Sequence, residues 1–207
     1  MLEADIAIAE KHLAATDPKM ARLIKAHGPC TLVAKKTDPF HVLCMSIISQ
    51  QLSGKAADTI ASRVKLKAGA KKNFKPEHLL KLSQEELRAC GLSNAKAKWL
   101  KALAAAVDSG TFSFAALRRM EHTAAVQALD DLPGVGQWTA EMFVMFALHH
   151  PDMFSLGDAG LRRAVNQLYG SGRALSDKRT LAIAQPWAPY RTVACWYLWR
   201  HADDKPT

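Results

Sequence analysis

The segment 132–136, with the sequence LPGVG, combines residue types that shape a backbone turn able to hold an anion. Pro133 fixes one backbone angle, and the two glycines permit left-handed angles and close approach by another molecule. A helix is predicted to start directly after this turn, near Gln137, so the amides of the turn would point outward beside a helix N-terminus. The segment is predicted to bind a phosphate through its backbone, or else to be an ordinary turn between helices.

The cysteines and the paired histidines show no spacing that is typical of a metal site. The cysteines are Cys30, Cys44, Cys90 and Cys195. They form no CxxC pair, zinc pattern or iron–sulfur run, so buried reduced thiols are predicted and an iron–sulfur cluster is not. His149 and His150 adjoin Pro151 without a ligand partner at helical spacing, which indicates the end of a helix.

The charge balance of the chain favours a nucleic-acid partner. Its 207 residues carry 28 Lys plus Arg against 19 Asp plus Glu, a formal charge of +9. This excess is typical of a protein that binds phosphates, although a soluble protein can also simply be basic. The basic run at positions 65, 67, 71, 72 and 75 is predicted to be solvated surface, with contact to DNA as the alternative.

No stretch of about 18 apolar residues is present, so no membrane span is predicted. The first fifteen residues carry Glu3, Asp5 and Glu10 and lack the layout of a signal peptide. Met1 is therefore expected to be the true start of a cytoplasmic protein.

Helix signals recur along the chain, and strand-like alternation does not. Ser83 and Glu86 form a capping box, Leu82 and Leu87 stand at staple positions around it, and Gly91 ends that short helix. Thr123 is predicted to cap another helix. The remaining helices are predicted at 40–49, 54–67, 96–108, 123–130, 137–149, 161–169, 179–185 and 190–201. The predicted class is all-α.

Five segments resemble, in order and spacing, the helix-hairpin-helix superfamily of DNA glycosylases, and within it the 3-methyladenine (alkylpurine) branch. Together they cover the chain from about residue 37 to its end. They are IISQQLSGKAA at 47–57, GLSNAKAK at 91–98, LPGVGQWTA at 132–140, FSLGDAGLRR at 154–163 and WAPYRTVACWYLWR at 187–200.

The resemblance implies a two-lobed helical fold with a DNA-binding cleft between the lobes. One lobe would be residues 37–130, and the other would combine residues 1–36 with 137–207. The hairpin, residues 131–136, would lie at the rim of the cleft. The chain looks like the compact form of the branch, which lacks an additional N-terminal β-rich domain.

The activity implied by the resemblance is that of a monofunctional DNA glycosylase. Such an enzyme flips a base of the 3-methyladenine or 7-methylguanine type out of double-stranded DNA and hydrolyses its N-glycosidic bond, leaving an abasic site for base excision repair. It would act as a monomer and require no cofactor. Two alternatives remain: a non-catalytic module that binds damaged DNA or junctions, and a glycosylase for deaminated or mismatched bases.

The resemblance assigns catalysis to Asp158. Breaking an N-glycosidic bond builds positive charge on the sugar, and a fixed carboxylate stabilises that charge or orients the attacking water. Asp158 would also suit the N-cap of the helix that begins near Ala159. Relatives often carry a second acid or another polar residue just before this aspartate, where this chain has Gly157.

Trp138 stands where strand-cleaving relatives have a lysine that forms a Schiff base, a reaction open to an amine and closed to an indole. By register, Lys96 and Lys98 would lie in the other lobe. The resemblance makes Trp138 and Trp199 walls of the base pocket. Tyr190 is a further pocket residue, whereas Trp187 and Trp196 are favoured as core.

The remaining assignments concern DNA contacts and an ion. By register Gln51 is the wedge that fills the gap left by the flipped nucleotide, Leu52 is the alternative, and Ser53 would lie near the minor groove beside it. The hairpin contacts would come from Gly134, Val135, Gly136 and Thr139, with Arg162 and Arg163 facing phosphates. A sodium or potassium ion would bind the backbone carbonyls of Asp130, Leu132 and Val135.

Overall fold

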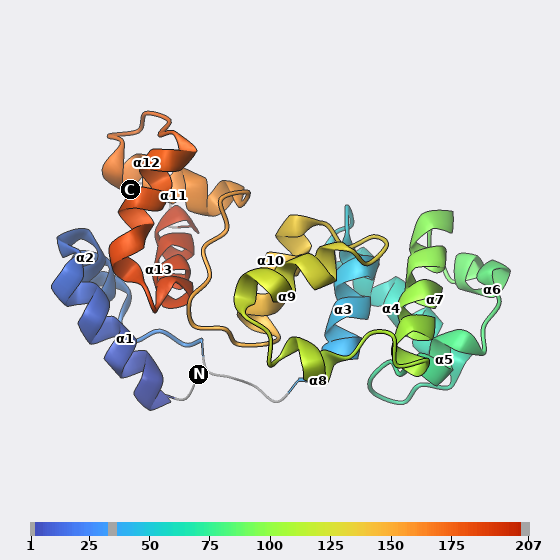
Figure 1. Cartoon of the computed structure of the whole chain (residues 1–207). Coiled ribbons are helices and arrows are strands. Elements are labelled where there is room, and N and C mark those ends of the chain that lie inside the picture. Colours follow the sequence, from blue (N-terminus) through green and yellow to red (C-terminus); the bar gives the residue numbers. More distant parts are fainter. Residues whose placement is uncertain (1–2, 33–36, 204–207) are drawn as a thin grey trace. The chain divides into compact units, whose positions relative to one another are not determined.

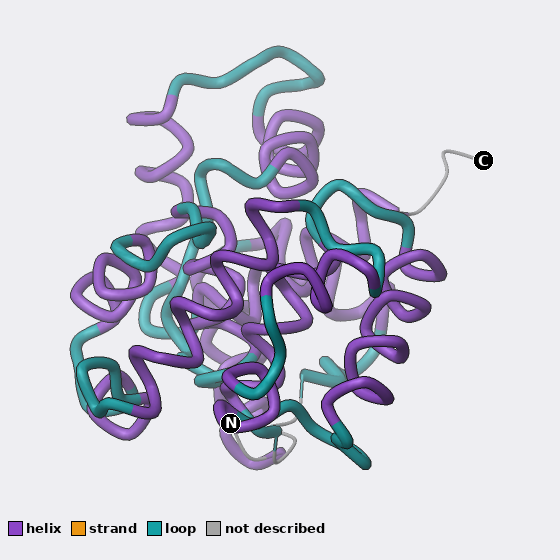
Figure 2. The backbone as a smooth tube through the Cα atoms, turned by 90° about the vertical axis from the view of Figure 1, so that its right-hand side faces the viewer, coloured by secondary structure: helices purple, strands orange, loops and turns teal. Residues whose placement is uncertain are grey.

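The computed structural model describes residues 3–32 and 37–203 (Figure 1). Within these ranges the regular structure is helical and contains no strand (Figure 2). None of the described helices is both long enough and apolar enough to cross a membrane. The predicted all-α class is confirmed.

The chain divides into two compact units. The terminal unit combines the described residues up to 32 with residues 144–203, and the central unit comprises residues 37–143. The predicted division differs: it places residues 137–207 with the N-terminal residues 1–36 and sets the hairpin, residues 131–136, apart. The structure assigns both the hairpin and the start of the following helix to the central unit.

The terminal unit is a cluster of helices around α13. Its helices are α1 (Glu3–Thr16), α2 (Pro18–His27), α11 (Ala159–Tyr169), α12 (Asp177–Ala184), the short 3-10 helix η1 (Gln185–Trp187) and α13 (Arg191–Asp203). Helix α13 packs against α11, α2 and α1. Leu13, Met20, Val165 and Leu198 are fully buried in this unit.

The central unit is also built of helices. Its helices are α3 (Pro39–Ser49), α4 (Gly54–Ala68), α5 (Pro76–Leu80), α6 (Gln84–Ala89), α7 (Asn94–Asp108), α8 (Phe114–Leu117) and α9 (His122–Asp130), followed by α10 (Gln137–Phe146), whose last turn crosses into the terminal unit. Helix α7 contacts α3, α5 and α6, and Leu100 and Leu103 of α7 are buried.

The sequence signals for helix ends agree with the structure for most of the helices. Ser83 and Glu86 form the predicted capping box at α6, with Ser83 N donating to Glu86 Oε2 at 2.9 Å and Glu86 N donating to Ser83 Oγ at 3.1 Å. The predicted cap of α9 was wrong. Glu121 is its N-cap and accepts a hydrogen bond from Thr123 N at 2.8 Å. A carboxylate two residues upstream thus takes the role that the threonine hydroxyl was expected to fill.

Helix α10 ends three residues earlier than predicted, at Phe146 instead of His149. His149 has φ of +57°, in the left-handed region, and His150 N donates to Val144 O at 3.1 Å. A left-handed residue cannot continue a right-handed helix, so the chain turns there. The four cysteines are free and buried, as the sequence predicted.

Asp17 joins three elements of the terminal unit. It caps α2 by accepting from Lys19 N at 2.8 Å and Met20 N at 3.4 Å. Its other oxygen accepts from Tyr169 Oη at 2.7 Å and from Trp187 Nε1 at 2.9 Å. Burial raises the pKa of this carboxyl, but hydrogen bonds from Tyr169, Trp187 and the backbone outweigh burial and lower the pKa below 3.8.

Replacing Asp17 by alanine is expected to destabilise the protein by about 2 kcal/mol at neutral pH, because the tyrosine and indole donors lose a charged acceptor. A lowered folded pKa means that this stabilisation is present above the unfolded pKa and is lost as the pH falls through the folded value. Urea unfolding of wild type and Asp17→Ala should therefore show a difference that shrinks below about pH 3.8. A difference that grows toward acid would contradict this assignment.

Candidate functional site

Asp158 lies at the N-terminus of α11 and is only 9% exposed. Its Oδ1 accepts a hydrogen bond from Leu161 N at 2.8 Å, so the aspartate is the N-cap of the helix. The same oxygen accepts from Trp199 Nε1 on α13 at 2.9 Å. Two donors from two helices therefore hold this carboxylate in one orientation, as a preorganised electrostatic group requires.

The loop that leads to Asp158 is fastened to the start of α13. Arg191 and Asp152 form a bidentate ion pair, with Nε–Oδ1 at 2.6 Å and Nη2–Oδ2 at 2.8 Å. The hydroxyl of Thr192 donates to His150 O at 2.7 Å and accepts from Met153 N at 3.0 Å. These contacts fix the path of the chain ahead of the aspartate.

Gly160 makes room for the indole that contacts Asp158. A Cβ atom at this position would lie 3.1 Å from Trp199 Cδ1 and 3.2 Å from Asp158 Oδ1, which is tighter than ordinary van der Waals contact. An aromatic ring also lies beside this indole, since the Phe146 and Trp199 ring centroids are 5.6 Å apart. Neither Gly160 nor Phe146 was predicted as a site residue. At Gly157, by contrast, a Cβ would meet nothing within 4 Å.

The other aromatic candidates of the terminal unit have structural contacts. Tyr190 packs edge-on against His12 of α1, with ring centroids 5.4 Å apart, and no described contact joins it to Asp158. Trp187 is fully buried, which confirms its predicted core position. Trp196 is half-buried and contacts the ring of Tyr197. Its assignment to the base pocket was already disfavoured.

The two arginines after Asp158 differ in their surroundings. Arg162 Nη2 donates to Leu156 O at 3.2 Å and pairs with Asp177 Oδ1 at 2.7 Å. Arg162 therefore holds the loop before the aspartate, which is an additional role beside the predicted phosphate contact. Arg163 is exposed and is the better placed of the two for a phosphate.

The turn between α3 and α4 carries the predicted wedge. Gln51 is exposed and has φ of +56°, a left-handed conformation that is strained for a residue with a side chain. Leu52 is 39% exposed. Ser53 is the N-cap of α4 and accepts from Ala56 N at 3.4 Å. The structure presents both wedge candidates to solvent on one tight turn.

A pocket of about 300 Å³ lies beside this turn within the central unit. Trp138, which is 52% exposed, and Met142 contribute apolar surface from α10. Hydroxyl and amide groups complete the lining. These are Ser46, Ser49, Gln50, Gln51 and Thr139. The structure thus brings the predicted wedge Gln51 together with Trp138 and Thr139, while Trp199 belongs to the terminal unit.

The conformation of the hairpin requires a glycine at position 134. Gly134 has φ of +83°, and a Cβ there would lie 2.2 Å from Trp99 Cδ2, so glycine is the residue that fits. Gln50 Nε2 donates to Gly134 O at 2.8 Å. This hydrogen bond joins the turn between α3 and α4 (residues 50–53, the wedge turn) to the hairpin. Val135 is buried and anchors the turn in the core.

Gly136 contrasts with Gly134. A Cβ at Gly136 would meet nothing within 4 Å, so its bare backbone borders open space. Gly136 O accepts from Ala140 N at 3.0 Å, which starts α10 directly after the turn. The first amides of a helix have no acceptor within the helix, and they attract anions. The outward side of the hairpin is therefore suited to a phosphate.

The position of Lys96 differs from the prediction. Lys96 and Lys98 lie on α7 in the central unit, as Trp138 does, and therefore not in an opposite lobe. The Lys96 amine donates to Ile48 O at 2.8 Å and Gln50 O at 2.6 Å, and so satisfies carbonyls at the end of α3. Burial lowers the pKa of Lys96. The amine therefore holds the end of α3, where the wedge turn begins.

The basic run after α4 has local partners. Lys67 pairs with Glu86 at 3.1 Å, Lys75 pairs with Glu77 at 3.9 Å, and Lys65 lies over the Phe74 ring. The two ion pairs are exposed, which is typical of a solvated surface, the predicted role.

Residues 44–189, most of the chain, match the HhH-GPD superfamily of base excision DNA repair proteins. The chain belongs to this superfamily. The DNA-3-methyladenine glycosylase 1 of Schizosaccharomyces pombe is 32% identical over 196 residues, which cover 93% of this chain and 86% of that protein.

Two solved structures share the fold over nearly the whole chain. A DNA-3-methyladenine glycosidase from Bacillus halodurans is 40% identical, with a TM-score of 0.88 over 94% of this chain and 89% of that chain. The S. pombe 3-methyladenine DNA glycosylase Mag1, solved in complex with abasic DNA, is 30% identical. Its TM-score is 0.79, over 96% of this chain and 99% of that chain.

Proposed function

We propose that the protein is a monofunctional DNA glycosylase that excises alkylated bases of the 3-methyladenine and 7-methylguanine type from double-stranded DNA. The observation that carries the proposal is the buried carboxylate of Asp158, held by Leu161 N and Trp199 Nε1 in a chain that belongs to a base excision repair superfamily. The relatives named as 3-methyladenine glycosylases support the choice of lesion. Release of free methylated base from alkylated duplex DNA tests it.

In this proposal each part of the site has one task. The outward amides of the hairpin, around Gly136, hold a phosphate of the DNA backbone and do not read sequence. Gln51, or its neighbour Leu52, fills the space that the flipped nucleotide leaves in the base stack. Trp138 presents an aromatic face to a cationic base, which such a face attracts.

Asp158 acts on the sugar as the N-glycosidic bond breaks. The bond's electron pair leaves with the base, and an alkylated purine accepts it readily because it is already cationic. The carboxylate stabilises the positive charge that develops on the sugar, and it orients or deprotonates the water that adds there. A binding module would gain nothing from a carboxylate directed at DNA, since phosphates repel it.

Backbone carbonyls at the hairpin could also hold a sodium or potassium ion. Helix α9 ends at Asp130, whose carbonyl accepts from no backbone amide of the described residues. Leu132 O accepts from Val135 N at 3.0 Å and keeps a second lone pair. Carbonyl oxygens of this kind suit hard cations, and the residues fit the proposed ligands Asp130, Leu132 and Val135. A bound cation would add positive charge to the side that faces a phosphate.

Gln51→Ala is expected to reduce excision from a fully paired duplex more than from a duplex in which the lesion faces a mismatch. A mismatched base costs less to extrude, so the wedge contributes less there. Single-turnover rates on the two substrates measure the difference. Gln51→Ala should leave folding intact because the side chain is exposed. Equal losses on both substrates would assign the wedge to Leu52.

The product is expected to be an unbroken strand with an abasic site. An indole at Trp138 cannot form the Schiff base that strand cleavage needs, and the Lys96 amine is bound to two carbonyls. Gel analysis before and after alkali, together with borohydride trapping, measures cleavage and the covalent intermediate. Lys96→Met is the matched variant. Efficient trapping that disappears in Lys96→Met would contradict the proposal and identify Lys96 as the nucleophile.

A further inference from the structure

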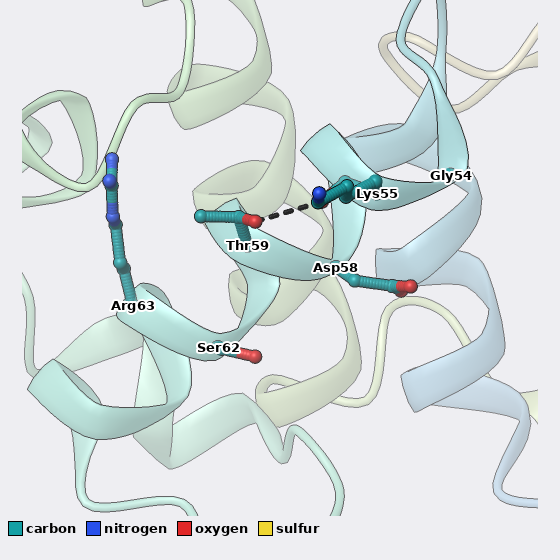
Figure 3. Close-up of a pocket in the computed structure, with 6 residues that line it drawn as sticks. All are labelled: Gly54, Lys55, Asp58, Thr59, Ser62 and Arg63. Atoms are coloured by element: carbon teal, nitrogen blue, oxygen red, sulfur yellow. Dashed lines mark hydrogen bonds between the residues drawn. The ribbon is translucent and has the colours of Figure 1, made fainter.

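A second surface hollow lies along α4, and none of the residues that line it has been assigned a role above. Its volume is about 680 Å³. Figure 3 shows the side chains that line it. It is lined by Gly54, Lys55, Asp58, Thr59, Ser62 and Arg63, and the last five side chains are exposed. At helical spacing, Lys55, Thr59 and Arg63 follow one another along a single face of α4. Asp58 lies at one margin of this stripe.

The cations of the hollow are unpaired within the described part of the chain. Neither Lys55 nor Arg63 forms an ion pair with any described residue, unlike Lys67 and Lys75 farther along the chain. The Thr59 hydroxyl donates to Lys55 O at 2.8 Å (Figure 3), so the donors that remain are the two cationic groups and the Ser62 hydroxyl. Unpaired cations in a hollow attract an anion.

The hollow continues from the wedge turn. Helix α4 begins one residue after Ser53, and the first amides of α4 add donors at that end. At the other end Arg63 reaches the turn before α7, where a Cβ at Gly91 would lie 3.8 Å from Arg63 Nη1. Lys55 and Arg63 are about 12 Å apart along the helix axis, so the two cations can reach different phosphates of one DNA strand.

We propose that this face of α4 binds the phosphodiester backbone of the duplex beside the lesion, through Lys55, Ser62 and Arg63. The inference rests on the proposed function, because the wedge turn that precedes α4 fixes which DNA lies next to it. Backbone contacts of this kind add affinity and register without reading bases. Asp58 opposes them, since its carboxylate faces the same phosphates.

The test is the salt dependence of binding to an undamaged duplex, measured with the full-length protein. The double variant Lys55→Gln/Arg63→Gln should lower the slope of log affinity against log salt by about 1.8, the loss of two phosphate contacts. Asp58→Asn should tighten binding about threefold, the scale of one exposed charge interaction. Lys11→Gln/Lys25→Gln removes the same charge from exposed positions on α1 and α2, and it should leave the slope within about 0.5 of wild type.

The proposal is overturned if the Lys55/Arg63 variant keeps the wild-type slope, if the Lys11/Lys25 control loses as much, or if Asp58→Asn weakens binding. Because Asp58→Asn is predicted to gain affinity, loss of folding cannot imitate the expected result. The readout uses undamaged DNA, so it does not depend on excision. If wild type binds duplex with these slopes and yet releases no methylated base, the glycosylase function fails and the α4 surface stands.

Discussion

Asp158→Asn is expected to lower the rate of base excision at least about a hundredfold, the scale of losing one preorganised electrostatic stabiliser. The substitution removes the negative charge and little else. Leu161 N and Trp199 Nε1 donate to the same oxygen, Oδ1, and the carbonyl of an asparagine can accept from both. The cap of α11 and the position of the indole should therefore persist.

Single-turnover excision, thermal unfolding and duplex binding together check this prediction. Tm should change little, and affinity for duplex DNA should be kept or improved because a charge that repels phosphates is gone. Asp158→Ala is the companion variant. It removes both acceptor contacts and is expected to lose stability as well as activity. Near-wild-type excision by a folded Asp158→Asn protein would reduce Asp158 to a helix cap.

Gly134→Ala is expected to destabilise the central unit by about 3 kcal/mol and to abolish tight DNA binding. The added methyl group would lie 2.2 Å from Trp99 Cδ2, a clash with a rigid ring, and the residue would keep φ of +83°. Overpacking and left-handed strain each carry a cost of this order. The hairpin would have to move away from Trp99, which would also disturb the Gln50 contact to Gly134 O.

Gly136→Ala is the matched control for Gly134→Ala. Its methyl group would meet nothing within 4 Å, so the free energy of unfolding should fall by less than about 1 kcal/mol. The methyl group would instead stand where a phosphate is proposed to approach, so duplex affinity should fall in a protein that remains folded. Urea unfolding and DNA titration separate the two effects. Equal stability losses in both variants would contradict the assigned packing of Gly134.

Local signals predicted most of the helices because each cap acts within a few residues. Ser83 and Glu86 contact each other across a single turn, and the pair is visible in the sequence. The end of α10 depends instead on His149 entering the left-handed region, which no residue type at that point demands. At the start of α9, Glu121 and Thr123 both have side chains that could cap the helix, so the sequence does not decide between them. Glu121 is the residue that does so.

The candidate residues of the site were predicted, but the contacts that hold them in place were not. The sequence pattern and the family resemblance indicated Asp158 and the hairpin. They did not reveal that Trp199 donates to Asp158, that Trp99 forbids a side chain at Gly134, or that Lys96 fixes the wedge turn. These contacts join residues 35 to 48 positions apart along the chain. Helical periodicity carries no information about such pairs.

The central claim is that this chain releases alkylated bases from DNA through Asp158. The most direct measurement is to incubate the purified protein with methylated duplex DNA and to identify the bases that appear free in solution. Wild type is expected to release 3-methyladenine or 7-methylguanine and to leave abasic sites, and Asp158→Asn is expected to release at most about a hundredth as much in the same time. Duplex binding by a folded wild-type protein without any released base would contradict the account.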